Sequence, residues 1–381
     1  RRSPRPGATV SARPGGARFR GVGGAHMQAE GLATQFPMDD ITAMGLASVV
    51  GKLPTIMRRL SETVAAIVAA PPDVLVLVDA PDFTHRVGSR VRRLRPRVPI
   101  VKYVAPTVWA WRPGRARAMR PWADAVLALL PFEPEAMARL GGPPTFYVGH
   151  PLLSELPQLR PSPEEAQRRG ADAPLLLVLP GSRRQEIHRM APIFGETLGV
   201  LAARGRAFEA VLPTPPRLRP LIEDEVARWP IRPRIVTGQD EKLAAFRSAR
   251  AALAASGTVT LELALAGVPL VGAYRVALFE AILARFVLST ESVLLANIAL
   301  GEPVLPELLQ FDCRPDRLAA ELERILKPGP AREAQRAAFR RLDELLSTGG
   351  RPAAGIAADR VAETAARGGA PRQIAAAPPL H

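Results

Sequence analysis

Residues 251–275, AALAASGTVTLELALAGVPLVGAYR, are the sequence feature that most restricts the fold of this chain. An apolar run, a turn of small residues, a short helical stretch and a second apolar run follow one another. This order predicts a strand, a turn at Ser256–Thr258, a helix and a second strand after Gly267, which together form a parallel βαβ unit. Parallel sheets are covered by helices on both faces, so the stretch favours an α/β fold.

The turn inside this unit has the chemistry of a phosphate site. Gly257 lets the backbone approach a ligand closely, and Ser256 or Thr258 can cap the following helix. The free N–H groups and dipole at a helix start favour a phosphate. Glu262 lies one helical turn beyond Thr258, where its carboxylate can accept hydrogen bonds from a ribose diol. A nucleotide-sugar site is therefore predicted, and an ordinary βαβ unit with a solvated Glu262 fits the residues equally well.

Further apolar runs alternate with helical stretches along the rest of the chain. In the first half, strands are expected at 73–79, 100–104, 123–130 and 145–148, with helices at 39–70 and 84–94. In the second half, strands are expected at 175–179, 207–211 and 234–236, with helices from about 186 and at 242–248, 315–326 and 331–346. The first strand, DVLVLVD, is apolar throughout, which is typical of a buried parallel strand.

Two Rossmann-like domains facing across a cleft are therefore expected, joined by the polar, proline-rich residues 155–174 as a linker. The expected division is a disordered low-complexity segment at 1–18, an N-terminal domain at 19–155, a C-terminal domain at 170–346, and a C-terminal helix with a loose tail at 347–381.

Composition narrows the possible partners. The chain of 381 residues carries 51 Lys and Arg against 36 Asp and Glu, a formal charge of +15, which favours anionic partners. Aromatic residues are only 5%, and no basic stripe alternates with them, which argues against nucleic acid. The single cysteine, Cys313, excludes an internal disulfide. No apolar run reaches membrane-spanning length, so we expect a soluble protein that at most binds an anionic membrane surface, with 39–70 and 278–288 as candidate contact segments.

Polar residues follow two of the first strands. In Asp79-Ala80-Pro81-Asp82, one carboxylate is a candidate general base, because ligands bind at the carboxyl ends of parallel strands. Asp82 is preferred because it lies further out on the loop, and a helix cap is the alternative. Trp109, Trp111 and Arg112 follow the next strand, where they can stack on a sugar or line an acyl groove, although packing between loops is slightly favoured.

In the second half, Gly181, Ser182 and Arg183 follow a strand in the same way. Gly181 permits close backbone approach, and the Ser182 and Arg183 side chains can bind phosphate oxygens. With Glu186, the same residues fit a capped helix start. The five histidines have no metal-ligand spacing, so no metal site is expected.

Eight motifs occur in order along the chain: VDAPDF (78–83), YVAPTVWAWRPGR (103–115), LLPFEPE (129–135), FYVGHPLL (146–153), LPGSRRQEI (179–187), ASGTVTLELALAGVPLVGAYR (255–275), LLANIALG (294–301) and PELLQ (306–310). Over roughly residues 19–346, they resemble lipid-A-disaccharide synthase, an inverting glycosyltransferase of the GT-B type. The resemblance implies that UDP-2,3-diacylglucosamine and 2,3-diacylglucosamine 1-phosphate condense to a β-1,6-linked disaccharide phosphate and UDP, in lipid A biosynthesis. It further implies that no cofactor or catalytic metal is needed, and a peripheral location on the cytoplasmic face of the inner membrane.

The resemblance also implies residue roles. Asp82 would be the general base for the acceptor 6-hydroxyl, with Asn297 as a second catalytic residue near the donor. Together with Gly181 and Ser182 from the loop argument, the expected UDP site comprises Arg183, Ser256, Gly257, Thr258, Glu262 and Gln310. Trp109, Trp111 and Arg112 remain the candidates on the acceptor side.

One departure from the family pattern concerns its first strand. Family members open with a strand and a Gly-Glu-x-Ser-Gly-Asp loop, and no residues here match it; we expect the neighbouring strands to be exposed. Two alternative functions also fit the motifs and the charge. One is another UDP-N-acetylglucosamine-using enzyme of this fold, a transferase or an epimerase. The other is a catalytically inactive basic protein that binds membrane surfaces. Oligomeric state and acyl-chain preference are left open.

Overall fold

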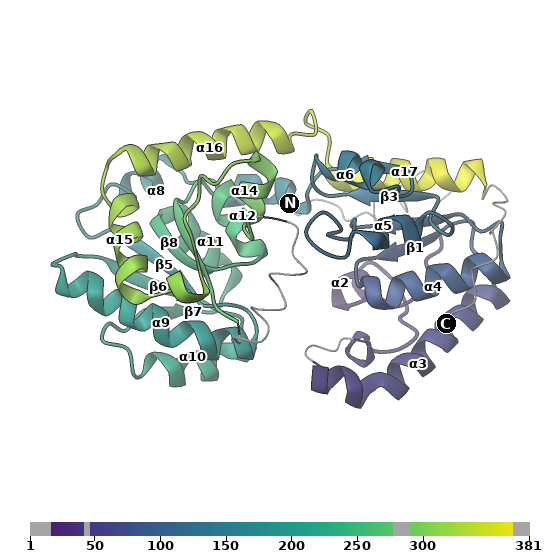
Figure 1. The fold of residues 1–381 in the computed structure, drawn as a ribbon, viewed down its shortest axis with the longest axis horizontal. Coiled ribbons are helices and arrows are strands. Elements are labelled where there is room, and N and C mark those ends of the chain that lie inside the picture. Colours follow the sequence, from purple (N-terminus) through teal and green to yellow (C-terminus); the bar gives the residue numbers. More distant parts are fainter. Residues whose placement is uncertain (1–16, 42–45, 277–289, 291, 369–381) are drawn as a thin grey trace. The chain divides into compact units, whose positions relative to one another are not determined.

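The computed structural model describes residues 17–41, 46–276, 290 and 292–368, which are the coloured parts of Figure 1. The chain divides into two compact units. Unit 1 contains the residues up to Leu153 together with those from Thr348 onward, and unit 2 is Ser154–Ser347. Each unit has its own parallel sheet, which confirms the predicted α/β class.

Unit 1 contains a four-stranded sheet in the order β1-β2-β3-β4. The strands are β1 (Leu75–Val78), β2 (Ile100–Tyr103), β3 (Ala125–Ala128) and β4 (Thr145–Tyr147). The described helices are α2 (Ala25–Gln28), α3 (Leu46–Ala69), α4 (Pro81–Leu94), α5 (Gly114–Met119), α6 (Glu133–Arg139) and α17 (Ala353–Arg367), with a 3-10 turn at Met38–Asp40. All four expected strands are present, and the helix expected at 39–70 is mainly α3.

The two faces of the unit 1 sheet are covered by different parts of the chain. On one face, Val87 and Val91 of α4 pack with Ile100 and Val126. On the other face, Ala357 of α17 packs with strand residues that include Val101 and Leu127. The last described helix therefore completes the core of unit 1, as its position beside β3 in Figure 1 suggests.

Strand β1 departs from the expected burial. Within the described residues it pairs only with β2, so it forms an edge of the sheet. Leu77 packs inward, whereas Val76 and Val78 on the opposite side are exposed. The prediction that this apolar run is a buried strand was therefore wrong for one of its faces. The exposure agrees instead with the expectation for strands that neighbour the unmatched first strand of the family.

Unit 2 contains a six-stranded parallel sheet in the order β10-β9-β8-β5-β6-β7. The strands are β5 (Leu175–Leu179), β6 (Glu209–Pro213), β7 (Arg234–Val236), β8 (Ala249–Ala255), β9 (Leu270–Tyr274) and β10 (Glu307–Leu309). The larger helices are α9 (Arg184–Ala203), α10 (Arg219–Val226), α11 (Gln239–Ser248), α12 (Thr258–Leu265), α15 (Pro315–Leu326) and α16 (Pro330–Leu346), and the short α14 spans Leu295–Leu300. The βαβ unit predicted at 251–275 is confirmed as β8-α12-β9.

The stretch expected to be a linker is a folded part of unit 2. It follows a 3-10 turn at Pro151–Glu155 and contains the short helices α7 (Leu156–Leu159) and α8 (Pro163–Arg168). The guanidinium of Arg169 donates to carbonyls at the ends of α11 and α12, including those of Phe246 and Gly267. The linker prediction was wrong because the prolines stand in first helical turns, where no N–H is needed, instead of interrupting structure.

We predict that Gly88→Ala destabilises unit 1 by about 1–3 kcal/mol, since overpacking forces neighbouring side chains from their rotamers. Gly88 lies in α4, and a Cβ atom built there would come within 2.5 Å of the Trp122 ring. The measurement is the free energy of unfolding in urea.

Gly355→Ala is the matched control, because Gly355 is in α17 and a Cβ atom there meets nothing within 4 Å. Because alanine has a higher helix propensity than glycine, Gly355→Ala should stabilise the chain by up to about 1 kcal/mol. Equal stability of the two variants would contradict tight packing between α4 and Trp122.

Candidate functional site

The turn after β1 presents Asp82 to solvent. Asp79 and Ala80 adopt left-handed backbone conformations, with φ of 43° and 41°. Asp82 then lies in the first turn of α4, and its side chain is 77% exposed. The N-cap of α4 is Ala80, and no side chain caps it. The alternative interpretation of these acids as helix caps is therefore wrong.

Two arginines face the Asp82 carboxylate. The Arg115 guanidinium on α5 donates to Asp82 Oδ1, and Arg112 Nη1 lies 4.0 Å from the same oxygen. Arg112 and Arg115 also stack over the Trp111 ring, at 4.4 and 5.2 Å from its centroid. Sequence reasoning singled out Arg112 and missed Arg115, whose proximity to Asp82 depends on how α5 follows β2. An exposed carboxylate beside two cations is thus built at the carboxyl edge of this sheet.

The two tryptophans have different environments. Trp109 Nε1 donates to Glu133 Oε1 at 3.2 Å, and its ring packs edge-on against Phe132. Trp111 Nε1 donates to Thr107 Oγ1, also within the loop. The contacts of Trp109 agree with packing between loops, whereas the Trp111–Arg112 pair lies beside the exposed Asp82.

In unit 2, the loop after β5 holds a carboxylate of its own. Gly181 has a φ of 127°, and a Cβ there would meet Glu186 Cβ at 2.6 Å. Glu186 accepts hydrogen bonds from Ser182 N at 3.1 Å and from Arg183 Nη1 at 2.8 Å. Tyr274 OH, at the end of β9, lies 3.4 Å from the same carboxylate. Burial raises the pKa of Tyr274, and the Glu186 charge raises it further. The Ser182 N–H and the Arg183 guanidinium are donors that could bind an anion, and in this structure both donate to the Glu186 carboxylate.

The turn at Ser256–Thr258 begins α12, at the end of the strand next to β5. Gly257 is the N-cap and no side chain caps the helix. Ser256 Oγ instead donates to the carbonyl of Val293 at 3.1 Å, and Thr258 is the first helical residue. The predicted capping by Ser256 or Thr258 was wrong. The helix start is therefore not satisfied by a side chain, which leaves N–H groups available to an anion.

Glu262 is buried beside a lysine. Its residue is 9% exposed, and Oε1 lies 2.6 Å from Lys242 Nζ on α11. The Lys242 ammonium also lies 5.0 Å from the centroid of the Phe246 ring. The interpretation of Glu262 as a solvated side chain is wrong. Lys242 was missed because its contact with Glu262 joins two helices that the sequence cannot place side by side.

Asn297, in α14, is a buried side chain that hydrogen-bonds the residues around the start of β10. It is 2% exposed; its amide nitrogen donates to Leu305 O at 2.9 Å and to Glu307 Oε1 at 2.7 Å, and its oxygen accepts from Leu305 N. Glu307 Oε2 in turn accepts from Val293 N, the residue whose carbonyl binds Ser256. The structure thus links Asn297 through Glu307 to the Ser256 turn.

Gln310 lies just after β10 in a left-handed conformation, with a φ of 52°. With its amide nitrogen and oxygen exchanged, the side chain donates to Val276 O at 3.3 Å and accepts from Val276 N at 3.2 Å. The guanidinium of Arg275 donates to the carbonyls of Gln310 and Cys313. These contacts connect β9 and β10 at their carboxyl ends, on the same edge as the two loops.

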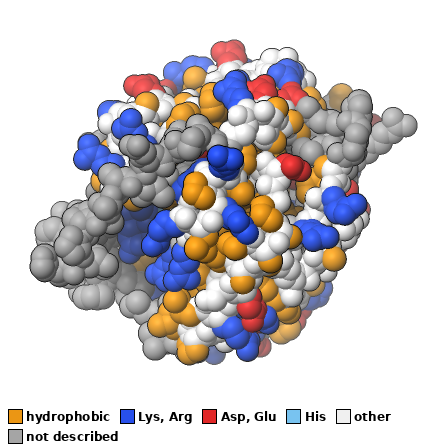
Figure 2. Space-filling view, turned by 90° about the vertical axis from the view of Figure 1, so that its right-hand side faces the viewer, with side chains coloured by type: hydrophobic (Ala, Val, Ile, Leu, Met, Phe, Trp, Pro, Cys, Tyr) orange, Lys and Arg blue, Asp and Glu red, His pale blue; other side chains and the backbone are white. Residues whose placement is uncertain are grey.

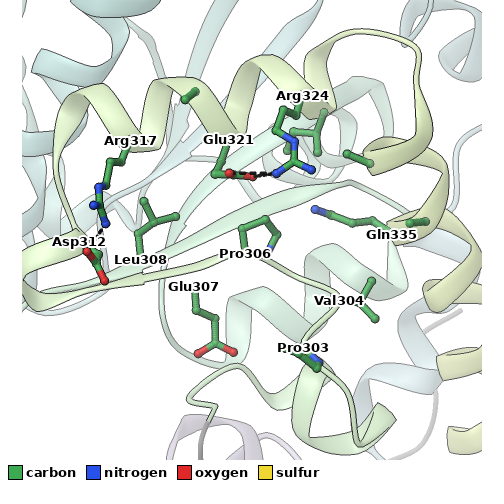
Figure 3. Close-up of a pocket in the computed structure, with 14 residues that line it drawn as sticks. Pro303, Val304, Pro306, Glu307, Leu308, Asp312, Arg317, Glu321, Arg324 and Gln335 are labelled. Carbon is green, nitrogen blue, oxygen red and sulfur yellow. Dashed lines mark hydrogen bonds and ion pairs between the residues drawn. The ribbon is translucent and has the colours of Figure 1, made fainter.

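A groove of about 690 Å³ borders β10 on the side of α15 and α16 (Figure 3). Arg317 and Arg324 line it, but each is paired with an acid, Asp312 and Glu321 respectively. None of the site residues predicted from the sequence lines this groove. In the described part of the chain, no group of three or more His, Cys, Asp or Glu side chains is arranged to hold a metal ion. No helix among these residues is both long and apolar enough to cross a membrane.

The sequence of the chain was compared with those of known proteins. The family model described as lipid-A-disaccharide synthetase matches residues 8–361. The lipid-A-disaccharide synthase of Bradyrhizobium diazoefficiens is 53% identical over 93% of this chain and 90% of its own length. That of Nitrobacter hamburgensis is 56% identical over 91% of this chain and 88% of its own length.

Solved structures share the fold at low sequence identity. The calicheamicin glycosyltransferase CalG4 has a TM-score of 0.55 and 18% identity, over 90% of this chain and 88% of its own. The UDP-GlcNAc 2-epimerase of Neisseria meningitidis has a TM-score of 0.56 and 12% identity, over 90% and 87%. At such identities the likeness shows the fold alone, which is that of the GT-B enzymes. The extent and identity of the sequence matches decide the family: the chain belongs to the lipid-A-disaccharide synthases.

Proposed function

We propose that this chain joins UDP-2,3-diacylglucosamine to 2,3-diacylglucosamine 1-phosphate, forming the β-1,6-linked disaccharide 1-phosphate and releasing UDP. The observation that carries the proposal is the family match over residues 8–361. The exposed Asp82 and the uncapped start of α12 supply the two kinds of chemistry that the reaction needs. The epimerase alternative has only a fold-level likeness in its support.

In the proposed mechanism, Asp82 is the general base. Its carboxylate takes the proton of the acceptor 6-hydroxyl while that oxygen attacks C1 of the donor sugar, and the bond from C1 to the diphosphate oxygen breaks with inversion. The exposure of Asp82 gives an acceptor access to it, and Arg115 and Arg112 fix the direction of the carboxylate. Trp111 and Arg112 are proposed to contact the acceptor sugar, with Trp109 supporting their loop.

UDP is proposed to bind at the carboxyl edge of the unit 2 sheet. Arg183, Ser182 N–H and the start of α12 would stabilise the charge that develops on departing UDP. Gly181 and Gly257 allow close backbone approach, Ser256 and Thr258 line the turn, and Glu262 accepts from the ribose hydroxyls. Arg183 would exchange its contact with Glu186 for the diphosphate.

Asn297 and Gln310 are proposed to position the loops that surround the donor, without touching the donor themselves. The buried amide of Asn297 holds Glu307 and, through Val293, the Ser256 turn. Gln310 connects the ends of β9 and β10. Positioning a reacting group by surrounding hydrogen bonds contributes to rate without touching the substrate.

We further propose that the protein works at the cytoplasmic face of the inner membrane, bound to its anionic surface. The net charge of +15 supports this location. Figure 2 shows Lys and Arg side chains beside apolar ones on one face of the molecule. On α3, the apolar residues Leu53 and Met57 are exposed. The other candidate contact segment, 278–288, lies outside the described residues.

Asp82→Asn should lower kcat by about 100- to 10,000-fold, since the amide keeps the shape of the side chain but cannot accept the proton. The assay measures UDP release that depends on both acylated substrates. Asp73→Asn is the matched control, because Asp73 is an exposed acid just before β1, and it should retain full activity. Full activity of Asp82→Asn would refute the base assignment. An unchanged chain that binds UDP but forms none from the two acylated substrates would refute the reaction.

Glu262→Gln should weaken UDP binding about tenfold, because the ribose hydroxyls lose a charged acceptor. Isothermal titration with UDP and with 2′-deoxy-UDP isolates this contact. The unchanged chain should bind the deoxy ligand less tightly than UDP, whereas the Glu262→Gln variant should hardly distinguish the two.

Arg183→Ala should weaken binding of both ligands to a similar extent, because it removes a diphosphate contact. Arg184→Ala, at the exposed neighbouring residue, is its control.

The outcome that would contradict the Glu262 prediction is also defined. If the Glu262→Gln variant still bound the deoxy ligand less tightly than UDP by the same factor as the unchanged chain, Glu262 would not be the ribose acceptor.

A further inference from the structure

Lys102, in β2, is a fully buried amine that the reaction scheme does not use. Its residue is 0% exposed. Nζ donates to the carbonyl oxygen of Asp79 and lies 3.1 Å from Thr84 Oγ1. Burying an ammonium is costly unless it is well paired, and here its acceptors are a carbonyl and a hydroxyl. The chain has only four lysines among its 51 basic residues, Lys52, Lys102, Lys242 and Lys327.

The acceptors of Lys102 belong to the strained turn that leads to Asp82. Asp79 and Ala80 have positive φ angles, a conformation that costs non-glycine residues of order 1 kcal/mol or more and persists only when the surroundings enforce it. Thr84 Oγ1 lies 2.7 Å from Asp79 O and 3.0 Å from Ala80 O. Lys102 therefore holds the Asp79 carbonyl, and Thr84 lies within hydrogen-bond distance of the Asp79 and Ala80 carbonyls, three and two residues before the proposed base.

The charge of this amine is sensitive to pH near neutrality. Burial lowers the pKa of Lys102 from 10.5 to about 7, and the negative charge of Asp79 opposes the shift. His85 on α4 adds no competing charge, since burial first, and the charges of Lys102 and Arg115 next, lower its pKa to about 4 against the opposing effect of Asp82. An ammonium offers three donors to the surrounding oxygens, whereas the neutral amine offers two and directs a lone pair toward them.

We propose that Lys102 is a positioning residue for Asp82: its ammonium, with the Thr84 hydroxyl, holds the strained Asp79–Ala80 turn and so fixes the direction in which Asp82 leaves the sheet. This inference rests on the proposed role of Asp82 as the base. A core lysine that only stabilises unit 1 would explain its burial, but would not affect the pH dependence of the chemical step.

The test compares Lys102→Met with Lys327→Met, an exposed lysine as control. Lys102→Met should lower kcat about tenfold or more, as expected for a misplaced catalytic group, with the KM of each substrate within about threefold. In the unchanged chain kcat should fall as pH rises through about 7, because the ammonium loses its proton. In Lys102→Met this decline should be absent. An unchanged kcat and pH profile in a folded Lys102→Met chain would overturn the proposal.

Two Thr84 variants provide a second route if Lys102→Met does not fold. Thr84→Val keeps the shape but removes the hydroxyl, and should lower kcat as Lys102→Met does, whereas Thr84→Ser should restore it. UDP binding, which depends on residues of unit 2, should be unchanged in both variants, and unfolding in urea followed by the fluorescence of Trp122, which packs in the core of unit 1, reports whether unit 1 is folded. Equal kcat values for Thr84→Val and Thr84→Ser would contradict the proposal that the hydroxyl at this position holds the Asp79–Ala80 turn.

A measurement independent of activity uses the small number of lysines. Labelling lysine Cε with ¹³C gives a spectrum with four side-chain signals, of which Lys102→Met removes one. That signal should titrate near pH 7. A Lys102 signal that stays constant between about pH 6 and 8 would contradict the pH dependence of kcat expected for the unchanged chain. If instead Asp82→Asn retained full activity, the proposed base would fail while the lysine titration still stood.

Discussion

Parallel strand direction is the constraint on which the rest of this molecule depends. When every strand of a sheet runs the same way, all the loops that follow the strands gather on one edge. In unit 1 that edge carries Asp82, Trp111 and Arg112, and in unit 2 it carries the Gly181 loop and the Ser256 turn. Residues far apart in sequence therefore meet without any special long-range signal, and each sheet builds a surface rich in polar groups above an apolar core.

Both surfaces depend on polar contacts in which at least one partner, Lys102, Glu262 or Asn297, is buried. Lys102 holds the turn before Asp82, Lys242 neutralises Glu262, and Asn297 supports Glu307. A buried polar group is tolerated only when it is hydrogen-bonded, so each of these contacts fixes one local conformation and excludes others. The exposed residues with proposed chemical roles can then occupy defined positions although they are themselves in solvent.

The sequence carried much of the fold because its strongest signals are local. The small-residue turn at 256–258 and the apolar runs around it located β8, α12 and β9, and DAPD marked the end of β1. Interactions between elements left no such signal: neither the edge position of β1 nor the Lys242–Glu262 pair follows from spacing along one strand or helix. The proline-rich stretch at 155–174 misled prediction because proline begins a helix as readily as it breaks one.

The return of α17 to unit 1 has a consequence for how the protein is made. Its Ala357 covers Val101 and Leu127, strand residues that are synthesised some 230 positions or more earlier. A chain emerging from the ribosome can finish unit 2, whose residues are continuous, before unit 1 receives its last helix. Until α17 has been synthesised, one face of the first sheet lacks its cover, so the nascent chain carries an apolar surface for the whole time that unit 2 is being synthesised.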